Sequence, residues 1–304
     1  MAVDAARAGL PTRGVRLRLS AIFWRRPWLK AAALLAPPVL GFVGVYLSSL
    51  VVLFVSAFWS IDSFSGKLLH VWTLDNFKQL FSTSDSTYWR ITGRTVGIAG
   101  AVTLTDALLA FPFAYYMARI ASRRMRTLLF VLVLLPLWSS YLVRIYSWTT
   151  ILQGKGVLNW SLNGVGLPDA NIAYTNWAVW IVFSYVWLPF MILPVYAALE
   201  RIPESYLEAS RDLGGRGFRT FRSVILPLAL PGVVAGSIFT FSLTLGDYIT
   251  PALVGGPSSS FIGNVVYNSI STNVAFSAAF ATVPVAVMAL YLSAAKRLGA
   301  FEAL

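Results

Sequence analysis

Three ionisable residues lie in or beside long apolar segments of this sequence. Asp106 and Arg144 fall inside such segments, and Asp247 falls at the end of another. Ionisable groups within a membrane-spanning helix are usually paired or functional. Counted from the Arg-rich ends of their segments, Asp106 lies about 18 Å deep and Arg144 about 25 Å deep. Because an arginine side chain can span this difference, we expect an Asp106–Arg144 ion pair; the alternative is that Ser, Thr or backbone groups satisfy each residue separately.

Asp247 is followed directly by Tyr248. A carboxylate and an aromatic face both attract an ammonium group. We therefore expect Asp247 and Tyr248 to contribute to a path for a cationic solute, with Trp138 and Tyr141 as further lining residues. The alternatives are that Asp247 caps the short segment after it and that the aromatic rings only pack.

The residue types that most catalytic sites need are missing. The chain has no cysteine, which excludes disulfides, zinc fingers and thiolate catalysis, and it has one histidine, His70. Neither Gly66-Lys67 nor Gly154-Lys155 is followed by Ser or Thr, so no phosphate-binding P-loop is present. We expect no enzymatic activity and no cofactor, and any ATP to be hydrolysed by another protein.

The composition predicts an integral membrane protein. Of 304 residues, 57% are hydrophobic and 12% are charged, with a mean hydropathy of +0.70, whereas a soluble domain is about 25% charged. A membrane span needs about 20 apolar residues, and six segments qualify: 31–59, 91–118, 127–152, 177–199, 224–245 and 276–295. We predict an all-α, polytopic protein of six transmembrane helices (31–295), with a basic tail (1–30) and a short C-terminal tail (296–304).

Loops rich in Lys and Arg alternate along the chain with loops that contain few of them. Eighteen of the 24 Lys and Arg residues lie in the two tails, the second loop and the fourth loop, five lie in the other loops (counting Arg94, in the first turn of the second span), and Arg144 lies within a span. Because positive residues stay cytoplasmic, both termini are expected in the cytoplasm. The basic residues form no contiguous patch, so the pI of 10.2 does not indicate nucleic-acid binding.

The fourth loop predicts a short amphipathic helix. Pro203 and Glu204 suit the first turn, and Gly214 would end the helix. Ile202, Tyr206, Ala209 and Leu213 share one apolar face at roughly helical spacing. Such a helix, within a loop at about 201–222, could dock into a groove on a partner or lie on the membrane surface.

The sequence of this loop resembles a known signature. Glu208-Ala209-Ser210, then Gly214, Val224 and Leu226-Pro227, are similar in type and spacing to the Glu-Ala-Ala…Gly…Ile-x-Leu-Pro motif of permease subunits of bacterial ABC importers. Ser210 replaces the second Ala and Val224 replaces Ile. Segments 136–146, 226–232, 245–256 and 297–301 also resemble the B-type permease of spermidine/putrescine importers, and the resemblance covers residues 31–304.

The resemblance implies a function and a set of partners. Permeases of this family lie in the bacterial inner membrane, and the helix with the motif is the coupling helix that sits in a cleft of an ATPase subunit. Two related permeases pair, two ABC ATPases bind below them, and an extracytoplasmic solute-binding protein delivers the solute, here a polyamine.

Other readings stay open at this stage. Related permeases are associated with ferric iron, opines or phosphonates. An ion-coupled secondary transporter often shows inverted repeats and broken helices, and no repeat is detectable here. A membrane enzyme or scaffold would be a third class, but no acid, base and nucleophile constellation supports an enzyme.

Overall fold

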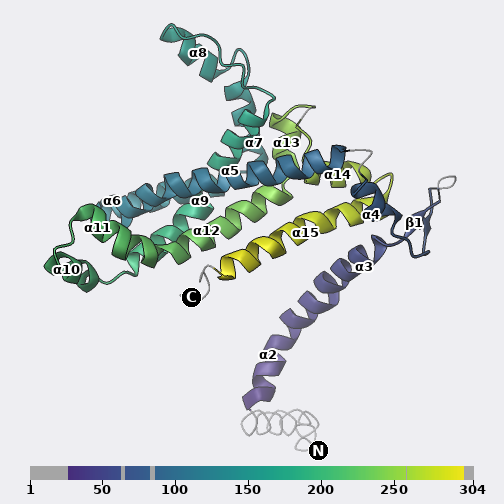
Figure 1. Ribbon diagram of the computed structural model, residues 1–304, viewed down its shortest axis with the longest axis horizontal. Coiled ribbons are helices and arrows are strands. Elements are labelled where there is room, and N and C mark those ends of the chain that lie inside the picture. The colour runs from purple at the N-terminus through teal and green to yellow at the C-terminus, as the bar shows by residue number, and fades with distance from the viewer. Residues whose placement is uncertain (1–26, 63–65, 83–85, 258, 298–304) are drawn as a thin grey trace, which may run out of the picture. The chain divides into compact units, whose positions relative to one another are not determined.

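Figure 1 shows the computed structural model, which describes residues 27–62, 66–82, 86–257 and 259–297. Most of the basic N-terminal tail and of the C-terminal tail, including segment 298–301 of the resemblance, lies outside the described residues. The chain divides into two compact units, Met1–Val55 and Ser56–Leu304, which are described separately.

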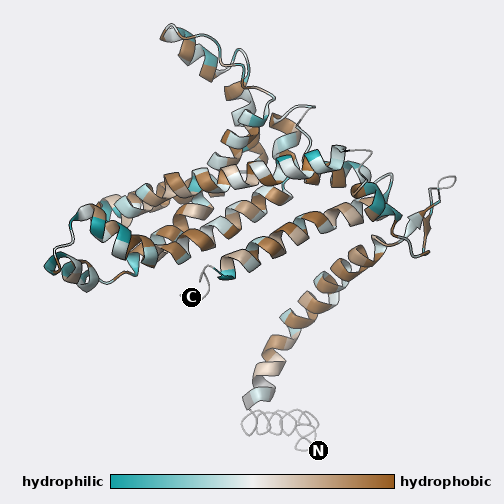
Figure 2. Ribbon diagram, viewed as in Figure 1, coloured by the Kyte–Doolittle hydropathy of each residue, from teal (hydrophilic) through white to brown (hydrophobic). Residues whose placement is uncertain are grey.

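The first unit contains the first predicted span. Helix α2 (Pro27–Gly41) continues through a π-helical turn, η1 (Phe42–Leu47), into α3 (Ser48–Ser56). Pro37 and Pro38 lie inside α2, and a proline frees a carbonyl four residues earlier. The stretch Ala31–Ser56 is long and apolar enough to cross a membrane, and Figure 2 shows hydrophobic residues along it.

The second unit is built on long helices. They are α5 (Thr87–Tyr115) with the π-turn η2 (Tyr116–Ile120), α9 (Asn176–Glu200), α12 (Leu226–Gly246) preceded by η3 (Phe221–Ile225), and α15 (Val274–Arg297). Helices α5, α9 and α12 pack against one another along their lengths. Within the described residues of both units, five helices could each cross a membrane, and a sixth span is possible if one bent helix pair counts as a span.

Two glycines allow α12 to approach α9 closely. A Cβ atom on Gly232 would lie 2.4 Å from Cβ of Ala198 and 2.6 Å from the carbonyl oxygen of Pro194. A Cβ on Gly236 would lie 2.6 Å from Sδ of Met191. Small residues four apart are a common helix-packing device in membranes, because they let backbones come together.

The third predicted span, 127–152, is not a single helix. Helix α6 (Arg123–Trp138) and helix α7 (Tyr141–Leu152) meet at an angle, and α6 is bent 95° relative to the stretch Tyr141–Gly164. Ser139 has an extended backbone (ψ 152°), and Pro136 in the last turn of α6 cannot donate a backbone hydrogen bond. The prediction of a continuous third helix was therefore wrong.

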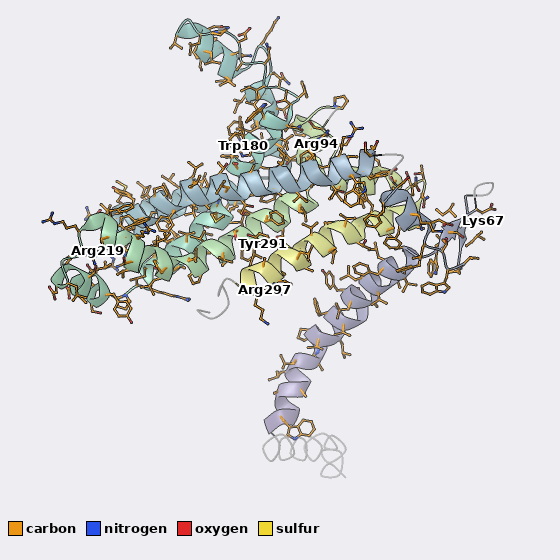
Figure 3. The ribbon with its side chains drawn as sticks, viewed as in Figure 1. Lys67, Arg94, Trp180, Arg219, Tyr291 and Arg297 are labelled. Carbon is orange, nitrogen blue, oxygen red and sulfur yellow. The ribbon has the colours of Figure 1, made fainter. Side chains whose placement is uncertain are left out.

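Short elements lie between the long helices. They are β1 (Ser60–Ile61), β2 (Leu68–Leu69), α4 (Asp75–Leu80), α8 (Val157–Gly164), α10 (Glu204–Asp212), α11 (Gly217–Thr220), α13 (Ile249–Val254) and α14 (Ile262–Ser269). β1 and β2 pair antiparallel. Side-chain hydrogen bonds join the long helices: Nε1 of Trp180 donates to Thr105 at 3.2 Å, and the hydroxyl of Tyr291 donates to Ser237 at 2.7 Å. Figure 3 labels Trp180 and Tyr291.

Candidate functional site

Helix α10 begins and ends as the sequence predicts. Pro203 precedes its first residue, and Glu204 places a carboxylate in the first turn, where the helix dipole favours it. At the other end, Gly214 has φ +76°. Its N–H donates to the carbonyl of Arg211 at 2.9 Å, and the N–H of Gly215 donates to the carbonyl of Ser210 at 2.8 Å. These two bonds form a Schellman motif, which requires a left-handed residue at Gly214.

The side of α10 that packs on the bundle differs from the predicted apolar face. Leu207, which the prediction did not include, is buried in one hydrophobic core with Ile202 and Ile225. Tyr206 and Leu213 instead point outward, with 52% and 85% of their surfaces exposed. Leu207 therefore anchors the helix to the core, and the side chains of Tyr206 and Leu213 on the other face remain exposed.

The two halves of the sequence motif line one groove. Ala209 and Ser210 on α10, and Val224 and Pro227 at the start of the fifth span, border a groove of about 530 Å³. Its remaining lining residues are Tyr206, Leu213, Gly215, Arg219, Ser223 and Leu228. Arg219 is labelled in Figure 3, and Figure 2 shows hydrophilic residues along α10 and α11.

A hydroxyl pair and a glycine fix the loop after α10. Oγ of Ser210 and Oγ1 of Thr220 lie 2.9 Å apart, so Ser210, one of the two residues that depart from the motif, joins α10 to α11. A Cβ on Gly215 would lie 2.5 Å from Oγ of Ser210 and 3.0 Å from Oγ1 of Thr220. The sequence predicts that the Gly214-Gly215 pair ends the helix, and the structure adds that Gly215 lies where a Cβ atom would meet the Ser210 and Thr220 hydroxyls.

The motif residue Glu208 is exposed and makes no hydrogen bond or ion pair within the described part of the chain. Leu226 is 36% exposed and lies next to the groove residue Pro227. The motif therefore combines half-buried positions, Ser210 and Val224, and the turn residue Gly214 with an exposed carboxylate and exposed apolar groups.

Asp247 and Tyr141 are brought together at the opposite end of α12. Oδ1 of Asp247 accepts the N–H groups of Ile249 (2.8 Å) and Thr250 (3.3 Å). Its Oδ2 accepts the Thr250 hydroxyl at 2.8 Å and the Tyr141 hydroxyl. A carboxylate has about four acceptor sites, so these donors fill them. The geometry is that of a cap on the first turn of α13, the alternative reading of Asp247.

The other predicted pathway residues are separate from this cluster. Trp138, at the end of α6, is 90% exposed and forms no ring pair or hydrogen bond among the described residues. Tyr248 stacks on Tyr267 with ring centroids 4.5 Å apart. The structure thus groups Tyr141 with Asp247, and it places the rings of Trp138 and Tyr248 at partly or largely exposed positions.

The expected Asp106–Arg144 ion pair is not formed. Asp106 is fully buried, and neither carboxylate oxygen has a hydrogen-bond partner; Ser184 on α9 lies beside it, outside hydrogen-bonding geometry. Nε and Nη1 of Arg144 are also buried and unpartnered, and the guanidinium lies over the Tyr141 ring, 5.8 Å from its centroid. The prediction was wrong because the depth estimate assumed a straight helix over 127–152, whereas the chain turns before Arg144.

No group of three or more His, Asp or Glu side chains within the described residues could hold a metal ion. The arrangement thus has a groove beside α10 at one end of α12 and a polar cluster around Asp247 at the other.

Comparison with known proteins identifies the family. The model of the binding-protein-dependent transport system inner membrane component matches residues 110–298. The chain belongs to this family. It is 45% identical over 97% of both chains to the inner membrane ABC transporter permease protein YdcU of Escherichia coli. It is 35% identical to the spermidine/putrescine permease PotB of Haemophilus influenzae, over 72% of this chain and 77% of PotB.

A solved structure agrees with the fold. A chain of a bacterial alginate ABC transporter, crystallised with an alginate-bound periplasmic protein, superposes with a TM-score of 0.73 at 18% identity, covering 92% of this chain and 98% of that one. The protein is an ABC importer permease of the inner membrane, a transport component and not an enzyme. The fold class and family expected from the sequence are confirmed.

Proposed function

We propose that this permease couples solute transport to a separate ATPase through α10. The observation that carries the proposal is the groove bordered by both halves of the motif, beside the exposed Glu208 and Leu213. An exposed amphipathic helix that buries one residue and presents apolar groups outward is suited to groove docking. The partners in this proposal are two ABC ATPases, a second permease and an extracytoplasmic binding protein.

The proposed orientation places α10 in the cytoplasm and Asp247 on the outer side. The two sites lie at opposite ends of α12, whose 21 residues span about 30 Å, close to the thickness of a hydrocarbon core. The excess of Lys and Arg in the loop with α10 supports this orientation.

The proposed solute is a polyamine such as spermidine or putrescine. The PotB relatives carry these solutes in their names. The exposed rings of Trp138 and Tyr248 offer faces for an ammonium group. Because the acceptor sites of Asp247 are filled by its own neighbours, we propose that it acts on a passing cation through its charge and not as a direct ligand.

The test is reconstitution of the permease in liposomes with its cognate ATPase, second permease and binding protein. We expect ATP-driven uptake of radiolabelled spermidine or putrescine that requires the binding protein. ATP-driven uptake of an opine, a phosphonate or ferric iron, with none of either polyamine, would contradict the solute assignment and leave the coupling role standing.

A further inference from the structure

Four arginines lie within eight positions at the junction of α5 and α6, and the structure separates them into two kinds. Arg123 and Arg124 are exposed, and their guanidinium groups have no partner within the described residues. Arg119 and Arg126 are largely or partly buried and are hydrogen-bonded. In the sequence all four serve equally as markers of membrane orientation.

Arg119 bonds to the end of α9 and to the linker that follows it. The residue lies in the π-turn η2 at the end of α5, and its side chain is 13% exposed. Nη2 donates to the carbonyl oxygens of Leu199 at 2.7 Å and Ile202 at 2.6 Å. The last carbonyls of a helix lack partners from a following turn, so the guanidinium supplies a donor to Leu199 in the last turn of α9 and complements the negative end of the α9 dipole.

The same side chain reaches α10. Nη1 of Arg119 lies 3.4 Å from Oε2 of Glu204, in the first turn of α10. One planar guanidinium therefore joins three elements, α5, α9 and α10, with donors on both terminal nitrogens. A lysine offers one ammonium on a shorter stem and cannot reproduce this forked geometry.

Arg126 supports the same linker from the start of α6. Its Nε and Nη2 donate to the carbonyls of Met117 (3.0 Å) and Ala118 (3.1 Å), and Nη1 lies 3.4 Å from Oε1 of Glu200. The Tyr196 hydroxyl donates to that same carboxylate oxygen at 2.8 Å. The linker between α9 and α10 is thus flanked by two glutamates, Glu200 and Glu204, each of which contacts one of these arginines.

The apolar packing in this region is shared by the same elements. Side chains from η2, α9, α10 and η3 belong to one buried core, and they include Met117, Leu199, Ile202, Leu207 and Ile225. The polar bonds of Arg119 and this core connect the same pieces of backbone. A force applied to α10 would therefore reach α5 and α9 without an intervening flexible segment.

We infer that Arg119 is a positioning residue that makes α10 move as one body with α5 and α9. When the ATPases displace α10, Arg119 passes that displacement to the spans. This inference rests on the proposed function, because it requires α10 to be the ATPase contact.

The experiment uses the assembled complex in liposomes and measures both solute uptake and ATP hydrolysis. In Arg119→Ala we expect the ATPases to co-purify and to hydrolyse ATP, while solute taken up per ATP falls about tenfold, as the loss of charge-assisted hydrogen bonds predicts. Arg119→Lys, which keeps the charge and the aliphatic stem, should show a smaller fall. The matched control, Arg124→Ala in the first turn of α6, should keep the wild-type ratio.

Wild-type uptake per ATP in Arg119→Ala would overturn the inference, as would an equal fall in Arg124→Ala. If Arg119→Ala does not accumulate, Arg119→Lys decides, and an unchanged ratio in that variant contradicts the inference. A wild-type complex that binds no ATPase would instead contradict the proposed function itself.

Discussion

At the residue scale, the structure changes the interpretation of several ionisable side chains that the sequence singles out. Asp247 is an acceptor saturated by its own neighbours, and Asp106 is buried without a partner. The sequence correctly singled out both as exceptions, because charge is rare in the spans. It could not supply their partners, since a partner depends on which faces of two helices meet.

The Tyr141–Asp247 bond predicts a measurable contribution to stability. Tyr141→Phe removes one donor from the carboxylate and keeps the ring that stacks on Trp187. We expect the free energy of unfolding in detergent micelles to fall by about 1–3 kcal/mol, the range for hydrogen bonds to charged groups. Tyr146→Phe, on the same helix but 56% exposed and with a phenolic hydroxyl that has no partner among the described residues, is the matched control. An equal loss in both variants would rule out a specific role for this bond.

At the element scale, the predictable features are those set by local chemistry. The Pro203-Glu204 start and the Gly214 end of α10 followed from the sequence, because capping depends on neighbouring residues. Five predicted spans correspond to long helices, because a run of about 20 apolar residues is also a local feature of the sequence. The 95° bend between α6 and the stretch after Ser140 was missed, since Ser and Pro are tolerated within straight membrane helices. The anchoring role of Leu207 was missed because it depends on tertiary packing.

The close contact of α9 with α12 makes a second prediction. Gly236→Val would place Cβ 2.6 Å from Sδ and 3.1 Å from Cα of Met191. We expect this overpacking to lower the free energy of unfolding by about 1–3 kcal/mol, measured as SDS-induced unfolding of the purified permease. In the control Gly97→Val on α5, the added Cβ meets no atom within 4 Å. Equal stability of Gly236→Val and Gly97→Val would show that the helices can separate at no cost.

At the scale of the whole molecule, we propose different roles for the two ends of the helix bundle. One end carries α10, its groove and the arginines that brace it; the other carries the polar cluster around Asp247. The composition predicted a membrane protein, and the lack of a P-loop sequence predicted that it has no ATP site of its own. The family relationship supplies the importer class, and the geometry supplies the surface by which a separate ATPase would drive it.

The most direct test of this account is a crosslink from α10 to the ATPase. The chain has no cysteine, so Leu213→Cys, at a position that is 85% exposed, gives a single attachment point for a maleimide–benzophenone crosslinker in the assembled complex. Val165→Cys, at the C-terminal end of α8 and 73% exposed, is the control at the other end. The account predicts that Leu213→Cys captures the ATPase and Val165→Cys does not. Capture from Val165→Cys, with none from Leu213→Cys, would contradict it.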